Sequence, residues 1–185
     1  MHRIASSDPL ALGPRSIALL RREGLLVDPQ RLYEGAIIEV ACEMSLEDRA
    51  PRPEEVDGWL AGRLERTLAR ILNRDAEWVR NGGGDDPAQA PGAFLARTLR
   101  LDPARMDEPT VRFHNLSKRT RRRFFALVLD GWTLTKTAEW FGGDAREIAD
   151  DLWEALFLLG LAREEHREGM LDELLRREST LENQP

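Results

Sequence analysis

The last third of the sequence carries small and apolar residues at the spacing that two helices meeting at a tight turn require. Ala138 is followed by Gly142 four positions later and by Ile148 ten positions later. A small side chain lets two helices approach closely, and a glycine accommodates the turn between them. Thr133 and Asp144 stand where the N-caps of the two helices belong. The segment therefore predicts a helix-turn-helix.

A third helix is predicted immediately before this pair, from Leu116 to Leu129. Ser117 or Asn115 is its expected cap, and the Asp-Gly pair at 130–131 ends it, because glycine accepts the left-handed conformation that closes a helix. Its inward face is expected to hold Phe124 or Phe125, Val128 and Leu129. The second helix of the pair should bury a stripe formed by Ile148, Leu152, Ala155, Leu156 and Leu159.

The rest of the chain also shows helical spacing, and signals for strands are scarce. One amphipathic helix is predicted over residues 32–44. Its expected inward side chains are Ile37, Ile38, Ala41 and Met44. Another helix opens at Pro53 with two acidic residues in its first turn, which suits the helix dipole. The apolar face predicted for it consists of Val56, Leu60, Leu64, Leu68, Ile71 and Leu72.

A break in the helical pattern divides the chain. Residues 81–92 read NGGGDDPAQAPG, and three consecutive glycines with two prolines cannot continue a helix. We therefore predict an all-α protein of two small helical units. The expected divisions are an N-terminal helical domain (1–80), a Gly/Pro/acidic linker (81–92), a helix-turn-helix domain with a trailing amphipathic helix (93–178) and a frayed tail (179–185).

Composition narrows the classes of partner. The formal net charge is −6, so binding to a polyanion requires a local basic patch. No apolar run approaches the ~18 residues that a membrane-spanning helix needs, and no signal peptide is apparent at the N-terminus. Cys42, the single cysteine, excludes an internal disulfide and is expected in the core. These features predict a cytoplasmic protein with no membrane partner.

Residues 116–156, LSKRTRRRFFALVLDGWTLTKTAEWFGGDAREIADDLWEAL, resemble the region 4 helix-turn-helix of bacterial sigma factors, especially the extracytoplasmic-function type. The positions in register with that family are Leu116, Arg119, Arg121, Phe124, Leu129, Gly131, Thr133, Ala138, Phe141, Gly142, Ile148 and Leu152. In the N-terminal half only residues 56–74 are faintly similar, to the helix that ends the polymerase-binding region. The resemblance implies a transcription-associated protein whose partners are RNA polymerase or another protein, and duplex DNA.

The charges of this segment oppose conventional reading of DNA by its last helix. Residues 133–156 carry two cations and six carboxylates, and a carboxylate in the groove weakens binding to phosphate. The cations that we expect to contact DNA, if DNA is bound, are Lys118, Arg119, Arg121, Arg122, Arg123, Lys136 and Arg146. The alternative is that the basic cluster forms a solvated face or a docking site for the acidic helix or for another protein.

The sequence is also compatible with a second function, which does not involve transcription through DNA binding. In it the sigma-like fold serves as a protein–protein adaptor or oligomerisation module without DNA binding. The expected partner-binding residues are Glu147, Asp150, Asp151, Trp153 and Glu154. Trp153 should lie at the edge of the buried stripe, where a tryptophan commonly anchors a partner. Trp132 and Trp140 are expected in the core or half-buried.

Nothing in the sequence favours catalysis. His2, His114 and His166 lie far apart and have no neighbours at the spacing of metal ligands. The glycine run at 82–84 follows no strand and precedes no Lys-Ser/Thr pair, so a phosphate-binding loop is not indicated. We therefore expect no metal, no cofactor and no enzymatic activity.

Overall fold

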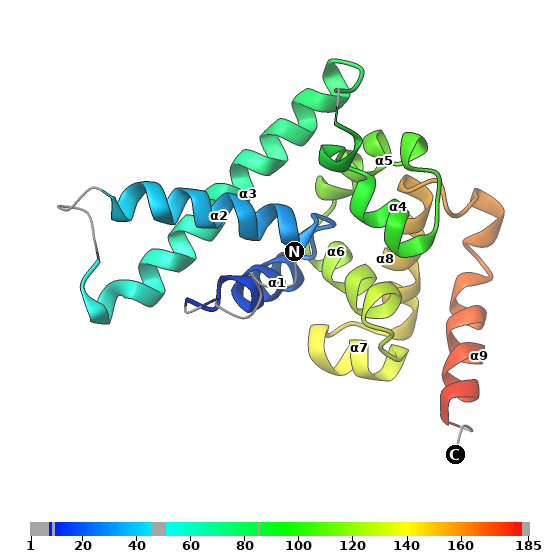
Figure 1. Cartoon of the computed structure of the whole chain (residues 1–185). Coiled ribbons are helices and arrows are strands. Elements are labelled where there is room, and N and C mark those ends of the chain that lie inside the picture. The colour runs from blue at the N-terminus through cyan, green and yellow to red at the C-terminus, as the bar shows by residue number, and fades with distance from the viewer. Residues whose placement is uncertain (1–7, 9, 46–50, 85, 183–185) are drawn as a thin grey trace.

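The computed structural model describes residues 8, 10–45, 51–84 and 86–182, and the regular elements among them are helices without any strand (Figure 1). The prediction of an all-α protein is confirmed. The α-helices are α1 (Leu12–Glu23), α2 (Pro29–Met44), α3 (Val56–Arg80), α4 (Ala93–Leu99), α5 (Asp107–His114), α6 (Lys118–Phe124), α7 (Leu134–Phe141), α8 (Ala145–Leu158) and α9 (Met170–Glu182).

Helices α1, α2 and α3 pack together around an apolar cluster of their own. Asp28 caps α2 by accepting a hydrogen bond from the Gln30 N–H at 2.9 Å, and Pro29 occupies the first helical position. A 3₁₀ turn at Pro53–Glu55 leads into α3. The apolar face predicted for α3 is largely correct, since its fully buried members are Leu60, Leu64, Leu68 and Ile71.

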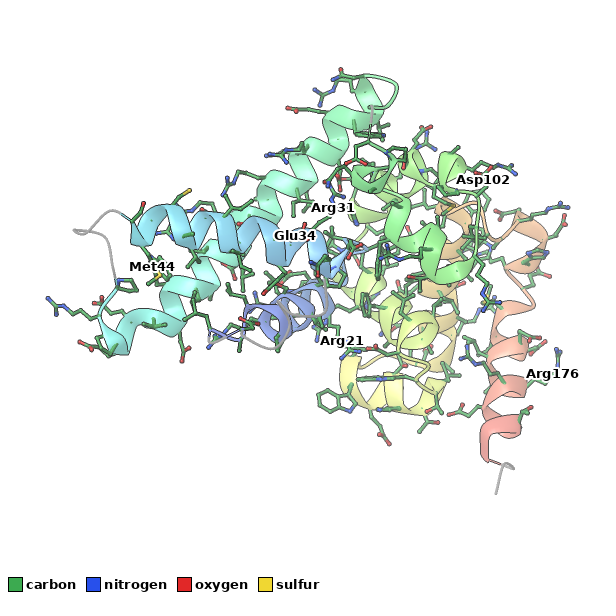
Figure 2. The ribbon with its side chains drawn as sticks, in the orientation of Figure 1. Arg21, Arg31, Glu34, Met44, Asp102 and Arg176 are labelled. Carbon is green, nitrogen blue, oxygen red and sulfur yellow. The ribbon has the colours of Figure 1, made fainter. Side chains whose placement is uncertain are left out.

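The face predicted for α2 is wrong except for Ile37, which is half-buried and packs against the apolar cluster. Its buried side chains are Leu32, Ala36 and Val40, whereas Ile38 is 65 % exposed and Met44 54 % exposed. Ala41 and Cys42, both expected inside, are also exposed. The i, i+4 spacing of the small and branched residues sets the buried stripe. Figure 2 shows Met44 at the end of α2 farthest from the C-terminal helices.

Close packing against α3 selects this face of α2. A Cβ atom at Gly35 would lie 2.8 Å from Cγ2 of Thr67, so a larger residue would force Thr67 or the helices to shift. Thr67 also donates a hydrogen bond to Glu39, one turn further along α2. These contacts orient α2 by small and polar residues, which its apolar periodicity does not reveal.

Helices α6, α7 and α8 form a compact head, and α4, α5 and α9 pack around it (Figure 1). Both predicted caps are confirmed. The Lys136 N–H donates to Oγ1 of Thr133 at 3.1 Å, and the Glu147 N–H donates to Oδ1 of Asp144 at 2.8 Å. Gly142 has φ 68° at the end of α7, a backbone conformation that favours glycine.

The predicted stripe of α8 is correct for Ile148, Leu152, Ala155 and Leu159, which are buried, while Leu156 is half-buried. The helix before α7 differs from the prediction. It is α-helical over Lys118–Phe124 and becomes a π-helix over Phe125–Leu129. The wider π turn changes the register of the side chains. Ala126 and Leu127 are consequently buried, and Val128 and Leu129 are half-buried.

The last three residues of the predicted linker are packed. Ala90, Pro91 and Gly92 are buried, and the Gly92 N–H donates to Oδ1 of Asp107 at 2.9 Å. Asp107 also accepts a hydrogen bond from Nε1 of Trp78 at 3.0 Å, so one carboxylate joins the end of α3 to the start of α5. At the other end of the chain, the first four residues of the predicted tail, 179–182, belong to α9; residues 183–185 lie outside the described part.

The N-terminal helices contact the head at the end of α1. Leu26, which follows α1, belongs to the apolar cluster of the C-terminal helices, and its N–H donates to Nε2 of His114 at 3.1 Å. Gly24, with φ 63°, lies against the backbone of α6, where a Cβ atom would come within 2.7 Å of the Arg121 carbonyl carbon. A glycine is therefore required at this junction.

Candidate functional site

The most basic helix of the protein, α6, turns one of its arginines into the interior. Arg123 has no exposed side-chain surface, although we expected it on a face open to DNA. It forms an ion pair with Asp151 of α8 and donates a hydrogen bond to the carbonyl oxygen of Gly142. Thr120 completes the site by donating to Oδ1 of Asp151 at 2.8 Å. The prediction that Arg123 contacts DNA is wrong, because a phosphate cannot reach it.

The same observation corrects the prediction made for Asp151. It was expected on the exposed partner-binding face of α8, but it is buried and serves Arg123. Buried charges are stable only when they are paired and hydrogen-bonded. This pair therefore holds α6, α8 and the turn after α7 in one arrangement.

Two further arginines of α6 are half-buried and engaged within the chain. Arg121 donates from Nε to the Glu23 carbonyl oxygen at 3.2 Å and from Nη1 to the carbonyl oxygen of His114. Burial lowers the pKa of Arg121 below its usual value. The guanidinium of Arg122 lies 4.7 Å from the ring centre of Phe141, a cation–π contact. Arg121 thus joins α6 to α1, and Arg122 joins it to α7.

Lys118 and Arg119 are exposed, yet both have acidic partners. Nζ of Lys118 lies 2.8 Å from Glu23 of α1, and Nε of Arg119 lies 3.5 Å from Asp151. Partial burial by itself would raise the pKa of Glu23, but hydrogen bonds from Lys118 and Arg22 bring that pKa below its usual value. All five cations of the predicted basic cluster therefore have partners inside the protein; Lys118 and Arg119 are exposed, Arg121 and Arg122 are half-buried, and Arg123 is buried.

The exposed face of α8 is mainly acidic. Arg146, Glu147 and Glu154 are exposed, and Asp150 is half-buried. Asp150 lies 3.9 Å from Arg146 and 3.5 Å from Arg167, so its charge is largely compensated. We name Glu147, Asp150 and Glu154 the acidic face of α8. The structure brings these predicted partner-binding residues together on one side of the helix.

Trp153 is buried, and its ring is engaged within the chain. Its Nε1 donates to the carbonyl oxygen of Arg163 at 3.1 Å, and its ring stacks on Phe157 with centres 5.0 Å apart. The guanidinium of Arg167 covers it at 4.7 Å. The position at an edge that we predicted is therefore taken by the segment leading to α9, which leaves little of the ring for another protein.

Helix α7 carries an aromatic group that the sequence did not place correctly. Trp140 is 70 % exposed, although we expected it to be at least half-buried. Trp132 is half-buried, stacks on Phe141 with centres 5.8 Å apart, and has Nζ of Lys136 4.2 Å above its ring. Lys136, one of the predicted DNA-binding cations, thus already makes a cation–π contact within its own chain.

A surface hollow opens between these aromatic rings and the end of α1. We call it the α1–α7 hollow. Figure 2 shows Arg21 at the end of α1 that faces α7. No signal in the sequence predicts this arrangement, because Arg21 and Arg22 are more than 100 residues away from the aromatic rings and meet them only in the fold. The residues that line it are Arg21, Arg22, Arg122, Phe125, Ala126, Asp130, Trp132, Trp140 and Phe141.

Within the described ranges, no three histidine, cysteine, aspartate or glutamate side chains are grouped so that they could hold a metal ion. His2 lies outside those ranges. The helices within them include none with the length and apolar character needed to cross a membrane. Comparison with known proteins returned no matching family model, no matching curated protein and no matching solved structure.

Proposed function

We propose that this chain is an adaptor protein built on a sigma-like helix-turn-helix, and that it binds another protein through the acidic face of α8 without reading duplex DNA. The observation that carries the proposal is the use of the basic cluster. Arg123 neutralises Asp151 inside the head, while Glu147, which lies 3.8 Å from the same guanidinium, and Glu154 remain exposed on the helix that would enter a DNA groove. A groove-facing helix of this charge is repelled by phosphate.

The magnitudes support protein binding over DNA reading. Two unit charges of the same sign separated by 4 Å repel by about 1 kcal/mol in water and by more near a protein surface. A good base contact contributes about 1–3 kcal/mol of discrimination. Two or three carboxylates near phosphates therefore cancel what one or two base contacts of Arg146 contribute. Against a basic protein surface the same carboxylates are attractive and increase the rate of association.

The first test is binding to duplex DNA. Fluorescence anisotropy of a labelled 30-base-pair duplex should show no binding by the full chain at ~50 mM salt, where even non-specific phosphate contacts are strong. Sedimentation velocity on the same samples reports whether the protein is a single species. Binding to the duplex that falls steeply between ~50 and ~200 mM salt would contradict the adaptor proposal.

The second test is direct binding to a protein partner. The resemblance makes purified core RNA polymerase the first partner to examine, by biolayer interferometry with immobilised full chain. Charge reversal at Glu147 and Glu154 should weaken binding at least tenfold. Glu34→Lys, an exposed carboxylate on α2, is the matched control and should leave binding unchanged. Equal binding by the charge-reversed protein and its parent would remove the acidic face from the proposal.

A sigma-like protein that contacts promoter DNA is the second candidate, and one observation favours it. Lys118, Arg119, Lys136 and Arg146 keep exposed side chains despite their internal partners. Such cations can follow a phosphate backbone without reading bases. In that case Lys118→Gln and Arg119→Gln together should lower the slope of log affinity against log salt by about two, whereas Arg66→Gln on α3 should not change it.

A further inference from the structure

The α1–α7 hollow combines exposed aromatic surface with a group of arginines. Packing alone seldom brings these two features together. Its volume is about 410 Å³, within the ~300–1,000 Å³ that small-molecule sites occupy. It lies between the last turn of α1 and the N-terminal side of the helix-turn-helix. The side chains that give it its chemistry are Arg21, Arg22, Arg122, Trp132, Trp140 and Phe141.

The aromatic side of the hollow offers a stacking surface. Trp132 is held in place by Phe141, with the two rings 14° from parallel. Trp140 tilts against Trp132 with ring centres 5.8 Å apart and is 70 % exposed. The chain therefore fixes one edge of the Trp140 ring and leaves its outer surface to solvent. A flat aromatic ligand can stack on this exposed surface.

The opposite side of the hollow is cationic. Arg21 is 57 % exposed and Arg22 is 56 % exposed. Arg21 gives one hydrogen bond to Asp130 at 2.8 Å, and a guanidinium has five N–H donors, so it retains donors for a second acceptor. Arg22 is shared between Glu23 and Glu65. Arg21 is thus the better placed of the two for a new anion.

Arg122 stands between the cationic and the aromatic sides. Its guanidinium covers Phe141, and its Nε is buried with no hydrogen-bond partner. Arg22 is neutralised by Glu23 and Glu65, but Arg21 and Arg122 against the single carboxylate of Asp130 still leave a net positive charge at the hollow, in a protein whose net charge is −6. The hollow is a local exception to the overall repulsion of anions.

We propose that the α1–α7 hollow binds a nucleotide unit, with the base stacked on Trp140 and the phosphate accepting hydrogen bonds from Arg21 and Arg122. Arginine binds phosphate through paired N–H donors, and an exposed tryptophan stacks on any base. A free nucleotide and a nucleotide within a single strand present this same chemistry. A duplex does not, because the faces of its bases are already stacked on one another. The hollow is separate from the acidic face of α8, so the two proposals fail independently.

The experiment uses the full chain and two probes. A fluorescein-labelled oligothymidylate of eight nucleotides is titrated by anisotropy at ~50 mM salt, and unlabelled ATP is added as a competitor. The oligonucleotide should bind, and Trp140→Ala should weaken its binding by roughly 5- to 150-fold, as expected for loss of one stacked base. Trp140→Phe should recover part of this affinity. If ATP competes, a free nucleotide is sufficient for binding. If the oligonucleotide binds and ATP does not compete, the ligand is a nucleotide within a single strand.

Matched variants make the result specific. Arg21→Gln should weaken binding, whereas Arg66→Gln, the same change of charge on an exposed arginine of α3, should not. Phe157→Ala removes another exposed aromatic ring and should have no effect. Circular dichroism confirms that each variant is folded. The proposal is overturned if neither probe binds, if Trp140→Ala binds as tightly as the parent, or if hexaglutamate competes as well as ATP.

Discussion

Replacing Arg123 by methionine should destabilise the protein by about 3 kcal/mol, the lower end of the range for breaking a buried ion pair. The substitution leaves the Asp151 carboxylate almost fully buried and removes the donor to the Gly142 carbonyl. Thr120 still donates to Asp151, and Arg119 at 3.5 Å offsets part of the lost charge, which is why the lower end applies. For a chain of this size such a loss lowers Tm by roughly 6–12 °C.

The assay is urea and thermal unfolding followed by circular dichroism at neutral pH. Removing both charges, with Arg123→Met and Asp151→Leu together, should restore most of the stability, because the unpaired carboxylate no longer exists. Arg146→Met removes an exposed arginine 3.9 Å from its partner and should change the free energy of unfolding by less than ~0.5 kcal/mol. The reasoning is refuted if Arg123→Met costs under ~1 kcal/mol, or if the double variant loses more than the single one.

Two further predictions concern the junction between α1 and the head. Burial, with smaller contributions from Arg121 and Arg31, lowers the pKa of His114 to about 3. The neutral form of His114 therefore stabilises the fold above pH 6.5, and this contribution is lost as pH falls toward 3. The free energy of unfolding should fall by up to ~1.4 kcal/mol per pH unit over this window, and His114→Gln should flatten that slope in acid titrations; an unchanged slope refutes the assignment. Gly24→Ala adds a Cβ against the α6 backbone and should destabilise by more than the ~1–2 kcal/mol of left-handed strain, whereas Gly131→Ala, at φ 66° with open space around it, should show that strain alone in urea unfolding. Equal losses in the two variants would show that the added Cβ does not clash with α6.

Local signals predicted the parts of the fold that local interactions determine. Thr133 and Asp144 cap α7 and α8 as expected, because a cap needs only a side-chain oxygen and a backbone N–H three residues later. The apolar face of α3 was equally predictable, because long branched side chains repeat along it every three to four residues. These features hold whatever the rest of the chain does.

The features that were predicted wrongly depend on partners distant in sequence. Arg123 was taken as a surface cation because of its type, although it shares a helix face with Thr120 and Leu127, both buried. The helical periodicity puts Arg123 on the buried side of α6. The sequence does not show that Asp151, 28 residues later, neutralises its charge. Cys42 and the apolar residues of α2 were misplaced for a related reason, since glycine and polar contacts with α3 orient that helix.

The α1–α7 hollow was not predictable at all from one sequence. Arg21 and Trp140 belong to segments that the chain brings together only after the head and the N-terminal helices have packed. Trp132, Trp140 and Trp153 lie close together in the sequence, but their number does not indicate which of them is exposed. An exposed tryptophan on a short helix is a reason to look for a ligand or a partner.

Most carboxylates of α8 are stabilised within the protein, and one is not. This difference predicts where a partner contacts the helix. Asp151 pairs with Arg123, and Asp150 is compensated by Arg146 and Arg167. Glu147 lies 3.8 Å from Arg123 and in the first turn, where the helix dipole stabilises a carboxylate. Glu154 has no ion-pair partner among the described residues. If core RNA polymerase is the partner, Glu154→Lys should therefore weaken its binding more than Asp150→Lys does, in the interferometry assay at ~50 mM salt. The opposite order would mean that the partner contacts the Arg146–Asp150–Arg167 group, where the acidic charge is already neutralised.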